Sequence, residues 1–374
     1  MTTLIVWDEA PRNNRYYFEA LNRSLRDILG QIGADNQHQL FENMRSSIDG
    51  LSYDEVEEIS AFTKWILKIG DRELCDLPFC DDQDESLEKI PNGLQLSTFG
   101  DPIATMVLSI YPSIELPDLE PSYVRERAIV TPKNINVTEI NNCILGITHG
   151  QQHIYLSTDS VEASCSDDDN INLLYPIEFI NQLEFNGVPS HILVLKVGAP
   201  IMLLRNLSPM TGLCNGTRLI ITQRVDRFIE AQIITGSNIG NRVFIPRIVF
   251  PINDGKCPFT IKQRQFPIRL CYVMTINKSQ GQSLKFVGVF LKEQVLTHGQ
   301  LYVALSRVTS KKGLKIISCD QEGNKLDHTK NIVYKDVLNT LPKGPLIFFR
   351  YFFFINKTFA YLLYYFYHTH ATYS

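Results

Sequence analysis

The sequence has no excess of basic residues. Against 40 Asp and Glu it carries 36 Lys and Arg, for a formal net charge of -4. This balance excludes a protein that coats nucleic acid through bulk positive charge, so any contact with nucleic acid must be local. Acidic residues gather at Asp54 to Glu88 and Asp167 to Asp169, while basic residues gather late in the chain. One electropositive face and ordinary solvated surface charge are both open interpretations.

Paired cysteines and a leader-like start are also missing. The eight cysteines form no C-x-x-C pair, and no histidine lies at ligand spacing, which argues against a zinc site. The first residues, MTTLIVWDEA, have neither a basic region nor a long apolar run, so no signal peptide is predicted. Scattered thiols are typical of a reducing compartment. We expect a nuclear location, with the cytosol or an organelle as alternatives.

What is present is an ordinary globular composition of domain-forming length. The 374 residues are 44% hydrophobic and 20% charged, which predicts two or three folded domains. Leu4 to Trp7 is typical of a buried parallel strand with Asp8 and Glu9 at its carboxyl end. Such a strand needs neighbours on both edges and helices on both faces. We therefore expect further sequence upstream of it.

A well-defined helix is predicted after residue 50. Ser52 is its expected N-cap, with Glu55 as the reciprocal capping partner, and Gly70 is its expected end. Its apolar residues recur at helical spacing and indicate core packing: Val56, Ile59, Phe62, Ile66 and Ile69. The acidic stretch from Asp81 to Gly93 is predicted to be a surface loop.

Two kinds of predicted secondary-structure pattern alternate after Arg127. The first is α/β: a strand at Ala128 to Val130 is followed by a turn and by a helix carrying Val137, Ile140 and Ile144. The second, between about Ile177 and Phe266, consists of short β-rich runs separated by Gly, Asn and Pro, and it indicates a small all-β insertion. Its predicted strands are Leu193 to Val197, Ile201 to Leu204, Arg218 to Thr222, Phe228 to Ile234 and Arg242 to Phe250.

The α/β pattern then resumes. A strand at Ile268 to Met274 leads through the polar turn Thr275 to Gly281 toward a strand at Phe286 to Leu291. A helix is predicted to begin at Thr297, whose hydroxyl would form a capping box with Gln300. The next predicted strand is Lys315 to Ser318.

Two features permit different readings. An apolar strand ending in Asp-Glu can place one carboxylate on a Mg²⁺ shell and the other against the attacking water, although a surface turn is the alternative. The aromatic run Leu346 to Tyr367 is long enough for a membrane anchor, but Arg350, Asn356 and Lys357 interrupt it. A tail without that role is favoured.

Six strings follow one another along the chain: LIVWDEAP, ENMR, VGAPIMLLRN, GLCNGTRL, MTINKSQGQSL and HGQLYVALSRV. In sequence and in order they resemble the motifs of PIF (petite integration frequency) helicases of superfamily one, including those of Helitron transposons. The similarity runs from residue 4 to about Leu338, and residues 345 to 374 lie outside it. The resemblance implies an α/β fold of RecA-like P-loop NTPase lobes, the first only a remnant and the second largely complete, with a small β-barrel insertion.

The resemblance also implies five domain limits. Residues 1–35 would be the remnant of the first lobe, 36–176 and 266–340 the two parts of the second lobe, 177–265 the β-rich insertion and 341–374 the aromatic tail. The implied activity is a monomeric, ATP- and Mg²⁺-dependent helicase that moves 5′ to 3′ on single-stranded or forked DNA, without a membrane partner. Roles in DNA repair, recombination, telomere maintenance or transposition would follow.

Single residues inherit roles from this resemblance. Asp8 would bind Mg²⁺, Glu9 would activate water, and Arg45 would reach the γ-phosphate. Gln280 and Gly281 would join DNA contacts to the nucleotide, beside the DNA-binding Thr275 and Lys278, since short side chains and amides can grip phosphates. Arg307 would be the finger that stabilises charge on the transferring phosphoryl group. Thr131 and Asn134 would approach the DNA backbone, although a helix cap explains them equally well. His298, Gln300 and Tyr302 share a string with Arg307.

The sequence departs from the family at the phosphate-binding loop. No G-x-x-x-x-G-K-[ST] string is present, and Gly255-Lys256-Cys257 lies in the β-rich region. A sensor strand expected between Leu29 and Asn43 is also absent. We therefore expect the isolated chain to be inactive as a motor, and a non-catalytic module that binds single-stranded DNA is the alternative hypothesis.

Overall fold

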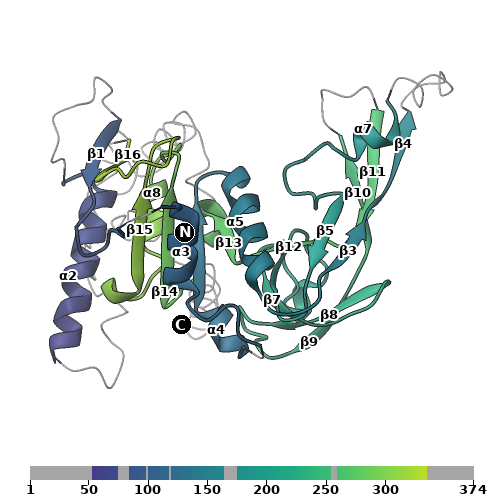
Figure 1. Ribbon diagram of the computed structural model, residues 1–374, viewed down its shortest axis with the longest axis horizontal. Coiled ribbons are helices and arrows are strands. Elements are labelled where there is room, and N and C mark those ends of the chain that lie inside the picture. Colours follow the sequence, from purple (N-terminus) through teal and green to yellow (C-terminus); the bar gives the residue numbers. More distant parts are fainter. Residues whose placement is uncertain are drawn as a thin grey trace, which may run out of the picture. The chain divides into compact units, whose positions relative to one another are not determined.

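The computed structural model describes residues 53–74, 84–97, 100–117, 119–163, 175–253 and 259–334 (Figure 1). Asp8, Glu9, Arg45, Ser52 and the aromatic tail lie outside these ranges. The chain divides into two compact units, each discontinuous in sequence. Of the described residues, unit 1 contains those within 53–112, 126–137 and 274–334, and unit 2 contains those within 113–125 and 138–273.

Unit 1 is an α/β unit around a four-stranded sheet of order β13-β2-β14-β15. Strands β2 (Arg127–Thr131), β14 (Phe286–Leu291) and β15 (Leu314–Ser318) pair in parallel. Strand β13 spans Val273–Thr275. Nearly every residue of β2 and β14 is buried, as expected of parallel strands covered on both faces. The predicted α/β class is therefore confirmed.

Helices cover this sheet. Helix α3 (Pro102–Ile110) begins at Asp101, whose Oδ1 accepts a hydrogen bond from the Ile103 amide at 2.9 Å. It packs so closely on β14 that a methyl group at Gly288 would lie 2.4 Å from Met106 Sδ. Helix α2 (Tyr53–Gly70) contacts α8 (Gln300–Leu305). Phe62, Ile66 and Ile69 of α2 are buried, which confirms the helix and its end at Gly70.

Two local predictions in unit 1 are wrong. The segment Glu85–Lys89 forms strand β1, antiparallel to β16 (His328–Ile332), rather than a surface loop. Its Ser86 and Glu88 side chains are buried and hydrogen-bonded to each other at 2.8 Å. Helix α8 starts at Gln300 after Gly299 in a left-handed conformation (φ 68), not at Thr297. The Thr297 hydroxyl has no hydrogen-bond partner among the described residues.

Unit 2 is β-rich. A five-stranded antiparallel sheet has the order β12-β6-β7-β8-β9, a three-stranded one the order β10-β11-β4, and β3 pairs with β5. The bounds are β3 His153–Leu156, β4 Thr158–Ala163, β5 Ile192–Leu195, β6 Pro200–Leu203, β7 Arg218–Arg224, β8 Phe228–Ile233, β9 Arg242–Pro246, β10 Ile248–Ile252, β11 Phe259–Gln265 and β12 Ile268–Leu270. Helices α4 (Pro121–Arg125), α5 (Asn134–Ile147, begun in unit 1) and α7 (Ile177–Ile180) complete it with the short turn η3 (Pro209–Thr211).

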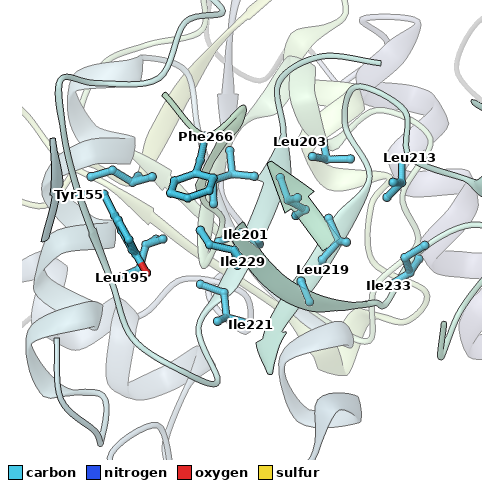
Figure 2. Packing of buried hydrophobic residues seen from close by; sticks show 14 residues of the cluster. Tyr155, Leu195, Ile201, Leu203, Leu213, Leu219, Ile221, Ile229, Ile233 and Phe266 are labelled. Carbon is cyan, nitrogen blue, oxygen red and sulfur yellow. The ribbon is translucent and has the colours of Figure 1, made fainter. Parts of the chain in front are cut away.

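The core of unit 2 is one cluster of buried side chains from several strands. Figure 2 shows Leu195 (β5), Ile201 (β6), Ile221 (β7) and Ile229 (β8) in this cluster with Tyr155 and Phe266, whose rings pack edge-on with centroids 5.1 Å apart. The predicted strand Arg242 to Phe250 is two strands, β9 and β10, broken at Arg247. Pro246 lacks an amide donor and suits a strand end. Arg247 there donates a hydrogen bond to the Leu156 carbonyl at 2.7 Å.

No helix within the described ranges is long and apolar enough to cross a bilayer.

Candidate functional site

The polar turn predicted at Thr275 to Gly281 forms a compact loop at the end of β13. Residues Ile276–Ser279 make a short 3-10 helix, η4, and Gly281 follows with φ +77. The Ser279 hydroxyl is buried and donates to the Ile276 carbonyl at 2.6 Å. Thr275, Lys278 and Gln280 are half-buried. A left-handed residue in this tight turn favours glycine, because a Cβ there is strained.

Arg307 connects this loop to α8. The residue is only 3% exposed. Its Nε donates to the Val303 carbonyl at 2.9 Å within the α8 turn. One terminal nitrogen donates to the Gln282 carbonyl at 3.2 Å, and the other donates to Ser306 Oγ at 2.7 Å. A longer contact of 3.5 Å reaches the Ser279 carbonyl. The structure thus brings Arg307 and the Thr275–Gly281 loop together. We call the hydrogen bonds from the Arg307 guanidinium to these main-chain carbonyls the Arg307 brace.

Two acceptors without a donor lie in this loop and directly after it. The buried Asn277 Oδ1 and Gln282 Oε1 have no hydrogen-bond donor among the described residues. Buried polar atoms are normally satisfied, so such atoms need an explanation. Both carry lone pairs and need a donor, and the loop is therefore able to accept hydrogen bonds from a ligand or from water.

The other residues of the HGQLYVALSRV string have structural duties. Gln300 is buried, and its Oε1 accepts from the Leu296 amide at 2.8 Å, which closes the turn before α8. The His298 ring stacks on Tyr334 with centroids 5.0 Å apart and accepts from the Tyr334 amide at 3.2 Å. Burial lowers the pKa of His298 to about 4. The Tyr302 ring lies against Gly70, where a methyl group would come within 2.8 Å of it.

Thr131 and Asn134 occupy the carboxyl end of β2 and the first residue of α5. Thr131 is fully buried, and its hydroxyl accepts from Asn136 Nδ2 at 3.4 Å. Asn134 is exposed. Asn136 also donates to Glu293 at 2.5 Å, and Lys133 lies 3.6 Å from that carboxylate. The sequence interpretation missed Lys133, Asn136 and Glu293, although Lys133 and Glu293 lie within the first three residues after a predicted strand.

One residue from the strings that lie in the β-rich unit has a packing role. Arg218, from GLCNGTRL, is completely buried and donates to the carbonyls of Val124 and Arg125 at 3.1 and 3.3 Å. It thereby holds the end of α4 on the sheet of unit 2. The predicted roles of Asp8, Glu9 and Arg45 lie outside the described residues. Within the described ranges no group of three or more His, Cys, Asp or Glu could hold a metal ion.

Comparisons with known proteins agree with the strings. The family model of the 2B domain of the DNA helicase Pif1 matches residues 178–223. The human ATP-dependent DNA helicase PIF1 is 32% identical over 144 residues, which are 38% of this chain and 22% of the human protein. The Pif1 helicase of Bdellovibrio bacteriovorus is 37% identical over 125 residues, 33% of this chain and 27% of that protein. The crystal structure of Pif1 helicase from Candida albicans has a TM-score of 0.44 and 19% identity, over 77% of this chain and 58% of that one.

The matched parts of this chain are therefore similar to parts of PIF-type DNA helicases. The described residues of unit 1 have an α/β fold. The curated relatives of the chain are ATP-dependent DNA helicases. The matched region spans about a quarter of their length, from 22% to 27% in the two proteins named above.

Proposed function

We propose that this chain contributes the second lobe and β-rich insertion of an ATP-dependent helicase that moves 5′ to 3′ on single-stranded or forked DNA. The observation that carries the proposal is the Arg307 brace. One guanidinium, just after α8, donates to the Ser279 carbonyl of the polar loop and to the carbonyl of Gln282, the residue that follows the loop. A shift of this arginine would therefore move the loop, and a shift of the loop would move the arginine.

This mechanical link suits a motor. In phosphoryl-transfer proteins an arginine stabilises charge on the transferring group, and the gain disappears after hydrolysis. If bound nucleotide changes the position of Arg307 and bound DNA changes the position of the loop, the hydrogen bonds between them couple nucleotide binding to DNA binding. Side chains such as the Thr275 hydroxyl and the Lys278 ammonium can contact phosphate oxygens without reading base sequence.

The described residues do not by themselves fit ATP and Mg²⁺. They provide no acidic cluster for a metal, and the 374-residue sequence contains no G-x-x-x-x-G-K-[ST] loop to cradle phosphates. We therefore expect background ATP hydrolysis from this polypeptide alone, with Asp8, Glu9 and Arg45 as contributors to a complete cleft. Monomeric action, a nuclear location and roles in repair, recombination or telomere maintenance belong to the same proposal.

The test separates DNA binding from hydrolysis. The purified chain should bind a fluorescent single-stranded oligonucleotide at low salt, and Thr275→Ala combined with Lys278→Ala should weaken binding. Lys285→Ala is the matched control, because Lys285 pairs with Glu126 at 2.7 Å at the amino end of β14. Absence of binding at low salt would remove the proposal.

A non-catalytic module that binds single-stranded DNA is the second candidate, favoured by the absent phosphate loop. The two candidates differ once a phosphate-loop polypeptide is supplied. Restored, DNA-stimulated ATP hydrolysis that Arg307→Ala abolishes would support the motor. Hydrolysis by the chain alone, lost in Glu9→Gln, would show that our expectation of an inactive chain is wrong.

A further inference from the structure

A pocket lies at the carboxyl edge of the parallel sheet in unit 1. Lys133 lines it just after β2, Lys292 and Glu293 line it just after β14, and Cys319 and Asp320 line it just after β15. Its volume is about 410 Å³, which lies within the usual range for small-ligand sites. We call it the switch-point pocket.

The name follows from the topology of the sheet. In the order β13-β2-β14-β15, the chain leaving β2 continues to β13 on one side, and the chain leaving β14 continues to β15 on the other. The connections thus diverge between β2 and β14. In open α/β sheets ligands bind outside the carboxyl ends of the strands at such a divergence.

The lining combines apolar side chains with lysines. Leu296 is 58% exposed and lies beside the buried Val295, and Leu326 also lines the pocket. The amines of Lys133, Lys292 and Lys330 line the same space. A ligand that matches both parts has a flat apolar group and a nearby negative charge.

The acidic groups of the pocket are already engaged. Glu293 accepts from Asn136 and lies 3.6 Å from Lys133. Asp320 accepts from the Asn324 amide at 2.8 Å and from the Asn324 side chain at 2.9 Å, and these contacts lower the pKa of its carboxyl group.

The lysines divide differently. Lys330 pairs with Glu85, whereas Lys292 is half-buried and forms no ion pair with any residue in the described ranges. The Lys292 amine is therefore a lining group that no carboxylate of the described residues holds at ion-pair distance.

We propose that the switch-point pocket binds one nucleotide unit of a nucleic acid single strand, with the base against Leu296 and Leu326 and a phosphate on Lys292. The inference rests on the proposed function, because it takes single-stranded DNA as the ligand. A free nucleotide has the same chemistry, and the experiment distinguishes the two sources.

The experiment measures binding of fluorescent oligothymidine to the full chain by anisotropy over a range of salt. One phosphate contact with a single strand contributes about 0.7 to the slope of log affinity against log salt. Lys292→Ala should therefore reduce the slope by about 0.7 and the affinity about fivefold at about 0.1 M salt. Lys292→Arg should retain both, and Leu296→Ser should weaken binding without a change of slope.

Lys311→Ala is the matched control. Lys311 is exposed in η5 (Lys311–Gly313), which precedes β15 and so lies at the amino edge of the same sheet. It should bind DNA like the wild type. Circular dichroism melting of each variant, with an unchanged transition, shows that the substitutions leave the fold intact.

Two results would overturn the inference while the proposed function stands. In the first, the wild type binds the strand and Lys292→Ala binds it with equal affinity and slope. In the second, Lys292→Ala binds the strand normally but loses affinity for thymidine monophosphate, which would assign the pocket to free nucleotides. A wild type that binds no strand at low salt would overturn both proposals together.

Discussion

The Arg307 brace leads to a measurable prediction for Arg307→Lys. The ammonium of lysine keeps the charge but cannot reach the Val303 carbonyl, the Gln282 carbonyl and Ser306 Oγ at once. Of three hydrogen bonds between 2.7 and 3.2 Å, two should be lost. At about 1.5 kcal/mol for each charge-assisted bond, the free energy of unfolding should fall by about 3 kcal/mol.

Hydrogen exchange locates the effect. In the wild type the Gln282 amide donates to the Ser279 carbonyl at 3.1 Å, so its protection reports on the loop. Mass-spectrometric exchange of the peptide covering residues 275–283 should become faster in Arg307→Lys, and urea unfolding should report the global loss. Lys312→Ala is the control, since its side chain is 78% exposed in an ion pair with Glu58. Unchanged exchange in the loop peptide would refute the brace and favour an arginine that acts only on a ligand.

Three further predictions concern packing, pH and a buried amide. Gly288→Ala should cost about 1 to 3 kcal/mol by overpacking against Met106, and combination with Met106→Ala should be at least about 1 kcal/mol less harmful than the sum in urea unfolding; strict additivity would contradict the contact. The pKa of His298 is about 4 in the folded chain and 6.5 as the ordinary value, so its contribution of about 3 kcal/mol is complete above pH 6.5 and lost as pH falls toward 4. His298→Phe should flatten the dependence of unfolding free energy on pH across that window, and an unaltered curve would exclude His298 as its source. Asn141 donates to the Val273 carbonyl and accepts from the Val273 amide, both at 3.0 Å; Asn141→Asp places an acceptor against that carbonyl and should lower the melting temperature, whereas an unchanged melting curve would count against this pair.

Local signals in the sequence located several elements well. The apolar spacing of α2 and its glycine end are properties of neighbouring residues, and the structure places the helix at Tyr53–Gly70. The Asp101-Pro102 pair is an equally local signal, since Pro102 opens α3 and Asp101 caps it. That helix could have been predicted from the same rules.

Elements that depend on distant partners could not be found this way. Strand β1 has the charged sequence ESLEK, and its buried Glu88 is stabilised partly by Asn331 Nδ2 at 3.4 Å, 243 positions away. No pattern of neighbouring residues predicts a partner that lies so far away in the sequence. The strings in the sequence predicted that Arg307 and the Thr275–Gly281 loop belong to one site. They could not predict that main-chain carbonyls occupy the donors of Arg307, because those partners are known only from the structure.

The discontinuity of unit 1 has a consequence during synthesis. Strand β2 pairs with β14 in a register that joins Arg127 to Phe286, so β2 leaves the ribosome roughly 160 residues before its neighbour. At about 5 to 20 residues per second it waits about 8 to 30 s. All strands of unit 2 from β3 to β12 emerge in that interval, and they can pair while β2 still presents an open, apolar edge. The nascent chain should therefore depend on chaperones most while unit 2 is being translated.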